Sequence, residues 1–245
     1  MFDLTGKVAL VTGAGRGVGE GIAHALAEHG AHVAVNDIVG GRAQSVADAI
    51  VADGGSASVA PFDVTDLGSV QAAVSELGHV DILVNNAGTG GAEPMTVEPF
   101  RAMDPRDWEG PIRVNLYGVL NCCKAVIDNM CAGGWGRIIT ISSGAGTAGV
   151  AIGVSPYSAG KGGGISFTRT LALEVARHGV TANTIAVGLM AQQDPAVTEA
   201  LARAIPVGRT GEPRDIGAAC VWLASDEAAW VTAQTIEVNG GSVTT

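Results

Sequence analysis

Charged and aromatic residues are scarce in this sequence, and basic side chains are the scarcest charged group. Charged residues make up 16% of the 245 residues and aromatic residues 4%. The 14 lysines and arginines are outnumbered by 24 aspartates and glutamates, which leaves a net charge of −10. We therefore expect neither nucleic acid nor an anionic membrane surface as a partner, because both repel an acidic protein. No apolar run approaches the roughly 18 residues that a membrane-spanning helix needs.

Cysteine and histidine are also few. The four cysteines, Cys122, Cys123, Cys131 and Cys220, lack C-x-x-C spacing and predict free thiols in a reducing compartment. The five histidines have no metal-ligand spacing, so we predict no metal site. The N-terminus lacks a basic segment followed by an apolar one, so we expect no signal peptide and a cytoplasmic location.

Apolar residues and glycine are abundant instead: 47% of the chain is hydrophobic and 36 residues are glycine. Short apolar runs alternate with segments of helical periodicity, which predicts an α/β fold with a parallel sheet covered by helices on both faces. The strands are expected over residues 7–12, 31–37, 56–61, 81–84, 136–141, 180–187 and 235–238, and the helices over 18–29, 42–52, 67–77, 108–130, 155–178 and 213–224. No linker divides the chain, so we predict a single domain over residues 1–245.

A glycine-rich turn joins the first predicted strand to the first predicted helix and includes Gly13, Gly17 and Gly19. Glycines let backbone N–H groups approach a diphosphate, and the helix N-terminus adds the positive end of its dipole. Asp37 ends the next predicted strand, at the spacing typical of an acid that binds the adenosine ribose. Its carboxylate would repel a 2′-phosphate and favours NAD over NADP, although Arg16 in the turn could reach such a phosphate.

Tyr157 and Lys161 lie four residues apart in a predicted helix and therefore share one face of it. A free tyrosine has a pKa of about 10, and a neighbouring cation favours the phenolate. The pair is a candidate general acid/base for proton transfer to or from an oxygen. Alone, this spacing is also typical of an ordinary exposed helix face.

Five motifs, taken together in their order, identify a family. They are the glycine motif at Thr12, Gly13, Gly17 and Gly19, the sequence Asn85-Asn86-Ala87-Gly88, Asn115 in Val114-Asn115-Leu116, Ser143 in Ile141-Ser142-Ser143, and Tyr157 with Lys161. The chain resembles the classical short-chain dehydrogenases/reductases along essentially its whole length. The resemblance implies a single-domain Rossmann fold with a doubly wound sheet of about seven strands.

The resemblance also implies site residues. Tyr157 would be the catalytic general acid/base, and Lys161 would lower the pKa of Tyr157 and bind the nicotinamide ribose. Ser143 would donate a hydrogen bond to the reacting oxygen. Asn115 would hold a water molecule. Ser142 is the rival to Ser143. The cofactor would contact Gly13, Arg16, Gly17, Val18, Gly19, Asp37, Asp63, Val64, Asn86, Ala87, Gly88, Tyr157, Lys161, Val187 and Gly188. Asp63 has the alternative role of a helix cap or turn residue.

Some positions depart from the family pattern. Val187-Gly188 stands where Pro-Gly is usual, and Gln192 stands where a threonine is usual. We expect a substrate lid around residues 188–210. An apolar substrate pocket is a further possibility and would use residues Ala148, Val150, Ile152, Val154, Leu189 and Met190.

The predicted function is hydride transfer between NAD(H) and a small-molecule secondary alcohol or ketone. One alternative is an NADPH-dependent 3-oxoacyl-(carrier protein or CoA) reductase, although Gly134 and His178 stand where such reductases tend to have basic residues. A second alternative, of another class, is a catalytically silent nucleotide-binding sensor. The family commonly forms dimers and tetramers, so we predict a homotetramer or a dimer.

Overall fold

The computed structural model describes residues 1–88 and 95–244, and these residues form one seven-stranded parallel sheet. The strands are β1 (Val8–Val11), β2 (His32–Val35), β3 (Ser56–Val59), β4 (Ile82–Asn85), β5 (Gly136–Ser143), β6 (Val180–Val187) and β7 (Thr235–Val238). Their order across the sheet is β3-β2-β1-β4-β5-β6-β7. The chain reverses direction across the sheet between β1 and β4, and ligands bind beside the carboxyl ends of the strands at such a point.

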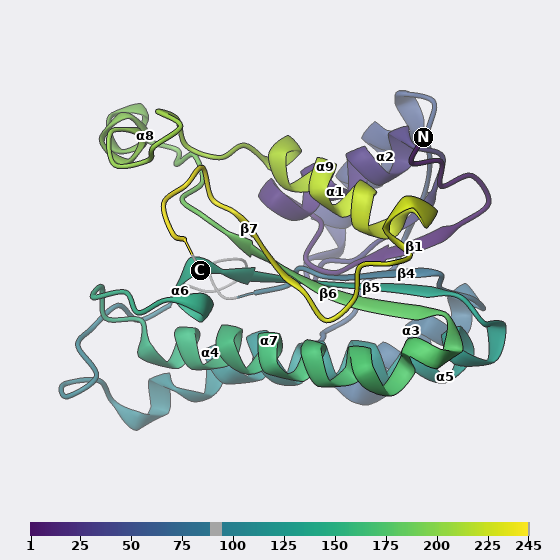
Figure 1. Cartoon of the computed structure of the whole chain (residues 1–245), viewed down its shortest axis with the longest axis horizontal. Helices are drawn as coiled ribbons and strands as arrows, with labels where there is room; N and C mark the ends of the chain where they lie inside the picture. Colours follow the sequence, from purple (N-terminus) through teal and green to yellow (C-terminus); the bar gives the residue numbers. More distant parts are fainter. Residues whose placement is uncertain (89–94, 245) are drawn as a thin grey trace.

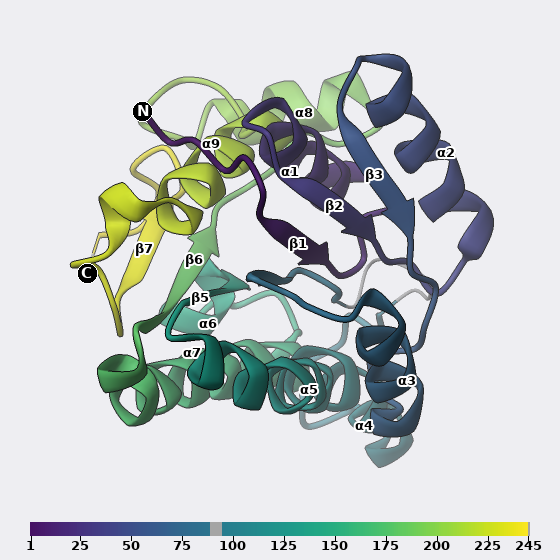
Figure 2. The same cartoon turned by 90° about the vertical axis from the view of Figure 1, so that its right-hand side faces the viewer.

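Helices cover both faces of this sheet. The α-helices of the described residues are α1 (Gly17–Glu28), α2 (Gly40–Ala52), α3 (Leu67–Leu77), α4 (Glu109–Ile112), α5 (Gly118–Gly133), α6 (Gly144–Thr147), α7 (Ser155–Val175), α8 (Pro195–Ala202) and α9 (Pro213–Ala224). Figures 1 and 2 show α1, α2 and α9 over one face and α3, α5 and α7 over the other. The predicted doubly wound α/β fold is confirmed.

The two apolar layers follow from the alternation of side chains along each strand. Ala9 and Val11 of β1 belong to the core under α1 and α9, whereas Leu10 between them belongs to the core under α3 and α5. Ile82 and Leu83 of β4 divide in the same way. Strands buried on both faces favour continuous apolar runs, and β1 (VALV) shows one. Strands β5 and β6 also bury polar side chains, among them Thr140 and Asn183.

The helix predicted over residues 108–130 is observed as a continuous helical run from Glu109 to Gly133, but its middle is not α-helical. A π-helical turn over Arg113–Tyr117 separates α4 from α5, and Asn115 lies within this turn. The side-chain amide of Asn115 donates to the carbonyl oxygen of Pro111 (2.8 Å), the group that the backbone N–H of residue 115 would use in a regular α-helix. Such turns inside helices occur frequently at functional sites.

Two other elements differ from the sequence-based expectation. The helix expected over 155–178 ends at Val175 and continues as a 3₁₀ turn, Ala176–His178. Helix α8 was not predicted, although Asp194 caps it and Pro195 begins it, which is a typical helix start.

The four cysteines are free thiols, of which only Cys131 is partly exposed. Burial raises the pKa of Cys123 to about 12, so this thiol stays protonated near neutral pH. None of the helices in residues 1–88 and 95–244 combines the length and the hydropathy that a membrane crossing requires.

Candidate active site

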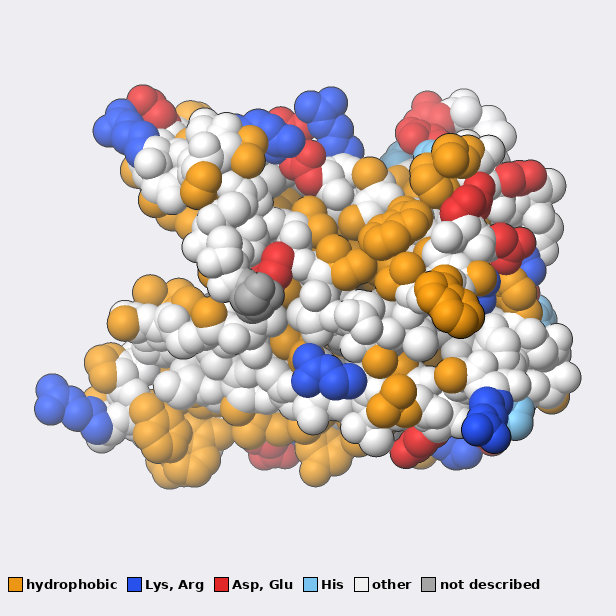
Figure 3. All heavy atoms as spheres, viewed as in Figure 1, with side chains coloured by type: hydrophobic (Ala, Val, Ile, Leu, Met, Phe, Trp, Pro, Cys, Tyr) orange, Lys and Arg blue, Asp and Glu red, His pale blue; other side chains and the backbone are white. Residues whose placement is uncertain are grey.

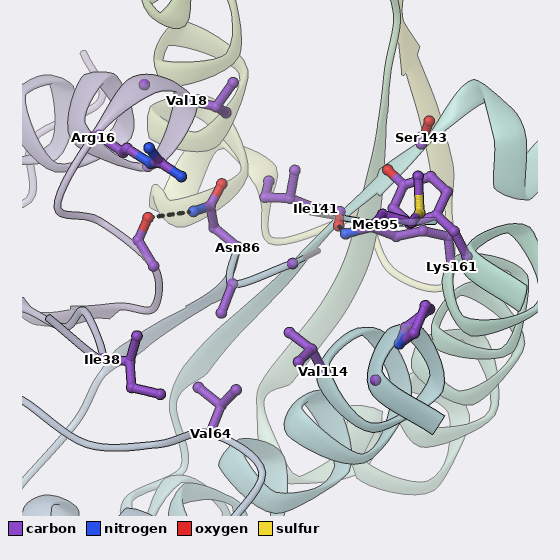
Figure 4. Close-up of a pocket in the computed structure, with 18 of the residues that line it drawn as sticks. Arg16, Val18, Ile38, Val64, Asn86, Met95, Val114, Ile141, Ser143 and Lys161 are labelled. Carbon is purple, nitrogen blue, oxygen red and sulfur yellow. Dashed lines mark hydrogen bonds between the residues drawn. The ribbon is translucent and has the colours of Figure 1, made fainter. Parts of the chain in front are cut away.

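A large cavity of about 1100 Å³ lies at the carboxyl ends of the strands. Figure 4 shows residues from both ends of this cavity, with Arg16 and Val18 on one side and Ser143 and Lys161 on the other. All the residues predicted to contact a cofactor line it: Gly13, Arg16, Gly17, Val18, Gly19, Asp37, Asp63, Val64, Asn86, Ala87, Gly88, Tyr157, Lys161, Val187 and Gly188. The structure thus brings together residues that are far apart in the sequence.

Backbone forms one wall of the cavity at the glycine turn. Gly13 has a φ of +61°, and a Cβ atom there would lie 2.8 Å from the Cα atom of Ala87. Only glycine therefore fits at this position. Helix α1 begins at Gly17; the side chain of the N-cap residue makes no capping bond, whereas Oε2 of Glu20 accepts the N–H of Gly17 (3.2 Å). The first turn of α1 borders the cavity with its dipole, as a diphosphate requires.

The Asn-Asn-Ala-Gly segment holds this turn in position. The side-chain amide of Asn86 donates to the carbonyl oxygens of Thr12 (2.9 Å) and Gly13 (3.0 Å). In return, the hydroxyl oxygen of Thr12 accepts the N–H groups of Asn86 and Ala87, each at 3.0 Å. These four bonds fix the ends of β1 and β4 relative to each other, so the cavity floor is preorganised.

Asp37 and Asp63 line the same end of the cavity as the glycine turn. The side chain of Asp37 is buried, and its Oδ1 accepts the N–H of Val39 (2.9 Å). The side chain of Asp63 accepts the N–H of Thr65 (2.8 Å) and so stabilises a turn, as the sequence analysis considered. Asp63 also lines the cavity. Asp66, rather than Asp63, caps α3.

Ser143 and Tyr157 meet at the other end. Ser143 ends β5, where its Oγ accepts the N–H of Ala145 (3.2 Å). Burial raises the pKa of Tyr157, and a hydrogen bond with Ser143 acts in the opposite direction. Ser142 points elsewhere, since its buried hydroxyl donates to the carbonyl oxygen of Lys161 (3.3 Å). Of the two serines, Ser143 is therefore the one that reaches the tyrosine.

Lys161 is fully buried one helical turn after Tyr157. Its Nζ donates to the carbonyl oxygen of Ile141 (2.7 Å) and lies 5.9 Å from the centroid of the Tyr157 ring. Burial lowers the pKa of Lys161 to about 8. The expected lowering of the Tyr157 pKa by Lys161 is not observed, because burial of the phenol outweighs the other influences and the ammonium bonds to backbone.

Gly88 allows Lys161 and Asn115 to approach each other. A Cβ atom on Gly88 would lie 3.0 Å from Oδ1 of Asn115 and 3.3 Å from Nζ of Lys161. Gly160 has a similar role, because its Cβ would lie 3.0 Å from both Cβ of Asn115 and the carbonyl oxygen of Pro111. The π-helical turn therefore packs directly against the helix that carries Tyr157 and Lys161.

Residues 7–199 match the family model described as short chain dehydrogenase. The chain belongs to the short-chain dehydrogenase family. It is 41% identical over 250 residues to the 3-oxoacyl-(acyl-carrier-protein) reductase FabG of Vibrio cholerae, with 98% of each chain covered. It is 42% identical over 247 residues to nodulation protein G of Azospirillum brasilense, with 96% of this chain and 97% of the relative covered.

A crystal structure of a gluconate 5-dehydrogenase from Burkholderia cenocepacia, in complex with NADP and tartrate, has a TM-score of 0.90 at 36% identity. It matches 98% of this chain, and 96% of its own chain is covered. This short-chain dehydrogenase is thus an oxidoreductase that acts on alcohol or ketone groups with a nicotinamide cofactor. The glycine turn and the N-terminus of α1 fit the diphosphate of such a cofactor.

The first residues of the 188–210 segment, Gly188 and residues 190–193, line the cavity of this dehydrogenase. Gln192 lines the cavity, and its side-chain amide donates to the carbonyl oxygen of Met190 (2.9 Å) while its backbone N–H donates to Oγ1 of Thr198 (2.9 Å). A lid in this segment remains a prediction.

The predicted apolar pocket is only partly observed. Of the expected residues, Met190 lines the cavity, whereas Val154 is buried in the core and Val150, Ile152 and Leu189 are exposed. Met95, Thr96 and Gln193 also line the cavity and were not named from the sequence, although Gln193 falls in the expected lid segment 188–210. They lie in irregular segments without a recognisable motif, so only their position after the strands β4 and β6 could have indicated them.

Proposed function

We propose that this dehydrogenase uses NAD(H) to interconvert a secondary alcohol and a ketone, with Tyr157 as the general acid/base. The single observation that carries the reaction is the meeting of Ser143 and Tyr157 in the same cavity as the glycine turn. The nicotinamide cofactor supplies or accepts the hydride. Tyr157 takes the hydroxyl proton of the alcohol, or returns it to the ketone oxygen in the reverse direction.

The residues around Tyr157 support this proton transfer. Ser143 donates a hydrogen bond to the same substrate oxygen and stabilises the charge that develops there. Lys161 lies one helical turn away with its Nζ on the carbonyl oxygen of Ile141, and its proposed role is to bind the nicotinamide ribose. Asn115 lies close to Lys161 across Gly88, where it would hold the water that connects the lysine to solvent.

Asp37 supports NAD rather than NADP. Its buried carboxylate lines the cavity, and its position at the end of β2 suits hydrogen bonds from the two hydroxyls of the adenosine ribose. A 2′-phosphate would meet a negative charge there. Arg16 lines the same end and could receive such a phosphate. The gluconate 5-dehydrogenase structure with NADP makes NADPH use the alternative to test.

Cofactor preference can be measured directly. We expect the wild-type enzyme to have a kcat/KM for NADH about ten-fold or more above that for NADPH, because a phosphate buried beside a carboxylate is repelled. Asp37→Asn keeps the size of the side chain and should reduce this ratio by about ten-fold. Asp63→Asn is the matched control, and its ratio should stay closer to the wild-type value. A wild-type preference for NADPH would contradict the proposal and favour the 3-oxoacyl reductase alternative.

The remaining predicted properties are separate proposals. A silent sensor is disfavoured, because the set Asn115, Ser143, Tyr157 and Lys161 is complete and three of its members line or reach the cavity. We retain the proposal of a homotetramer, with a dimer as the alternative. Sedimentation at micromolar concentration tests it, and a monomer would contradict it.

A further inference from the structure

The segment that leaves the sheet after β6 lines the cavity but is weakly packed against the rest of the molecule. The structure describes all of residues 189–204, and none of them is buried. Helix α8 has no buried residue, and Figure 3 shows it projecting above a hollow at the left of the molecule. Residues 190–193 nevertheless line the cavity. The position of this part of the cavity wall is therefore fixed at the two ends of the segment rather than along its length.

Both ends of this segment are bonded to the short stretch of chain that follows β7. At the first end, the N–H of Gly188 donates to the carbonyl oxygen of Val238 (3.1 Å). At the second end, the N–H of Val207 donates to the carbonyl oxygen of Gly240 (3.1 Å). Figure 1 shows this stretch, in yellow, beside the segment that carries α8. The residue between the two acceptors is Asn239.

The same stretch is in close contact with both ends of the segment. A Cβ atom on Gly188 would lie 2.6 Å from the Cα atom of Asn239, which is itself buried. A Cβ atom on Gly240 would lie 2.6 Å from Cγ2 of Ile205, the first buried residue after 188. Gly188 lines the cavity, so a displacement of Asn239 would move the start of the cavity wall.

The side-chain amide of Asn239 holds this stretch in its turn. Its Nδ2 donates to Oε2 of Glu237 (3.0 Å) and to the carbonyl oxygen of Val243 (2.9 Å). Its Oδ1 accepts the N–H of Gly241 (2.8 Å). Oε1 of Glu237 is buried and has no hydrogen-bond partner within residues 1–88 and 95–244. The bond from Asn239 therefore stabilises a carboxylate that is partly removed from water, and hydrogen bonds to charged groups are the stronger kind.

We propose that Asn239 is a positioning residue for the cofactor, because its amide fixes the stretch that holds Gly188 and Val207. It is not among the described residues that line the cavity, so it acts through Gly188. The inference rests on the proposed function in that it takes NADH as the occupant of the cavity. Ser143 and Tyr157 lie on β5 and α7, so loss of the amide should weaken NADH binding much more than it slows the chemical step.

Asn239→Asp tests the amide with a side chain of the same size. It replaces the donor by a second carboxylate at the 3.0 Å distance that now separates Nδ2 from Oε2 of Glu237. Like charges repel, so at about pH 8 the dissociation constant for NADH should rise by about ten-fold, while kcat with methyl acetoacetate should change by about three-fold at most. NADH fluorescence and steady-state kinetics on the full-length enzyme measure the two quantities.

The pH dependence of this variant shows whether the bond itself is responsible. At lower pH the two carboxyl groups share one proton, and the protonated group can donate to the other. The ratio of the variant's dissociation constant to that of the wild type should therefore fall toward one at about pH 6. A defect caused only by a distorted turn would leave this ratio unchanged.

A second substitution restores the bond with donor and acceptor exchanged. In the double variant that combines Asn239→Asp with Glu237→Gln, the new amide can donate to the new carboxylate. The dissociation constant for NADH at about pH 8 should then return to within about three-fold of the wild type. If circular dichroism shows Asn239→Asp alone to be unfolded, Asn239→Ala takes its place, and its dissociation constant should rise by about three-fold or more.

Asn183→Asp is the matched control. The amide of Asn183 is also buried, donates to the carbonyl oxygen of Val231 (2.8 Å) and accepts the N–H of Gln234 (3.1 Å). It lies in the first half of β6, away from Gly188. The control should lose stability, but its dissociation constant for NADH should stay within about two-fold of the wild type.

The outcomes separate this inference from the proposed function. If neither Asn239 variant weakens NADH binding, or if Asn183→Asp weakens it equally, the inference is wrong and the proposed function stands. If the wild type binds NADH but reduces no ketone, the proposed reaction fails, whereas a loss of affinity that the double variant repairs still supports the inference. If the wild type does not bind NADH, both are wrong.

Discussion

The nucleotide end of the cavity has walls of backbone, whereas the reaction end has walls of side chains. At the nucleotide end, Gly13 approaches the Cα atom of Ala87, and the amide of Asn86 holds two backbone carbonyl oxygens. At the reaction end, Met95, Met190 and Gln193 extend from irregular segments. One end is thus fixed by main-chain geometry that tolerates few residue types, and the other can change its residues without disturbing the fold.

This difference explains how much the sequence could predict. Glycines at fixed spacing and the strands around them leave a recognisable pattern, so the glycine turn, Asp37 and the Asn-Asn-Ala-Gly segment were placed correctly in one cavity. Strand and helix bounds such as Val180–Val187 and Leu67–Leu77 were also predicted as observed, because their apolar periodicity is strong.

The misses have physical causes of their own. The π-helical turn at Asn115 depends on a side chain bonding to the carbonyl of Pro111, and apolar periodicity carries no information about such a bond. The pKa of Tyr157 depends on how deeply the phenol is buried, which spacing along a helix cannot reveal. The side chains of the reaction end lie in segments with no period at all, so their contacts could only come from the structure.

Among variants that affect only one end of the cavity, we expect the largest effect at the reaction end. Ser143→Ala removes the hydroxyl that reaches Tyr157, and we expect kcat to fall by about 10²–10³-fold with little change in cofactor affinity. Steady-state kinetics and NADH titration by fluorescence measure the two quantities. Ser142→Ala is the matched control and should change kcat much less, because its hydroxyl points at the backbone of Lys161. Equal losses in both variants would contradict the assignment of Ser143.

The second-largest effect is expected at the nucleotide end, on the affinity for NADH. Gly13→Ala places a methyl group against the Cα atom of Ala87 at a position with φ of +61°, so the dissociation constant for NADH should rise by about ten-fold or more. Gly54→Ala is the matched control, because Gly54 also has a positive φ (+87°) but no atom lies within 4 Å of the added methyl. Gly54→Ala should lose about 1 kcal/mol of stability, Gly13→Ala should lose more because its methyl meets backbone, and only Gly13→Ala should lose affinity. Similar NADH affinities in the two would contradict the role of close packing.

The smallest effect concerns Lys161 at the reaction end. Its pKa is lowered by burial from 10.5 to about 8, so the unfolded chain holds more protons at this residue between these values. Lys161 therefore makes stability rise with pH in that window, by about 1 kcal/mol per pH unit at most, and contributes no such slope below pH 8. Denaturant unfolding of the wild type and of Lys161→Met at several pH values measures this difference. A variant with the same slope as the wild type would contradict the burial of a charged Lys161.

The central claim is that Tyr157 moves the proton while the rest of the cavity binds the cofactor. The measurement that tests it most directly is NADH absorbance during reduction of a neutral ketone by the wild type and by Tyr157→Phe, with NADH binding measured on both proteins. The account predicts turnover by the wild type, a loss of about 10³-fold or more in the variant, and an NADH affinity that changes little. Turnover that survives in Tyr157→Phe would contradict it.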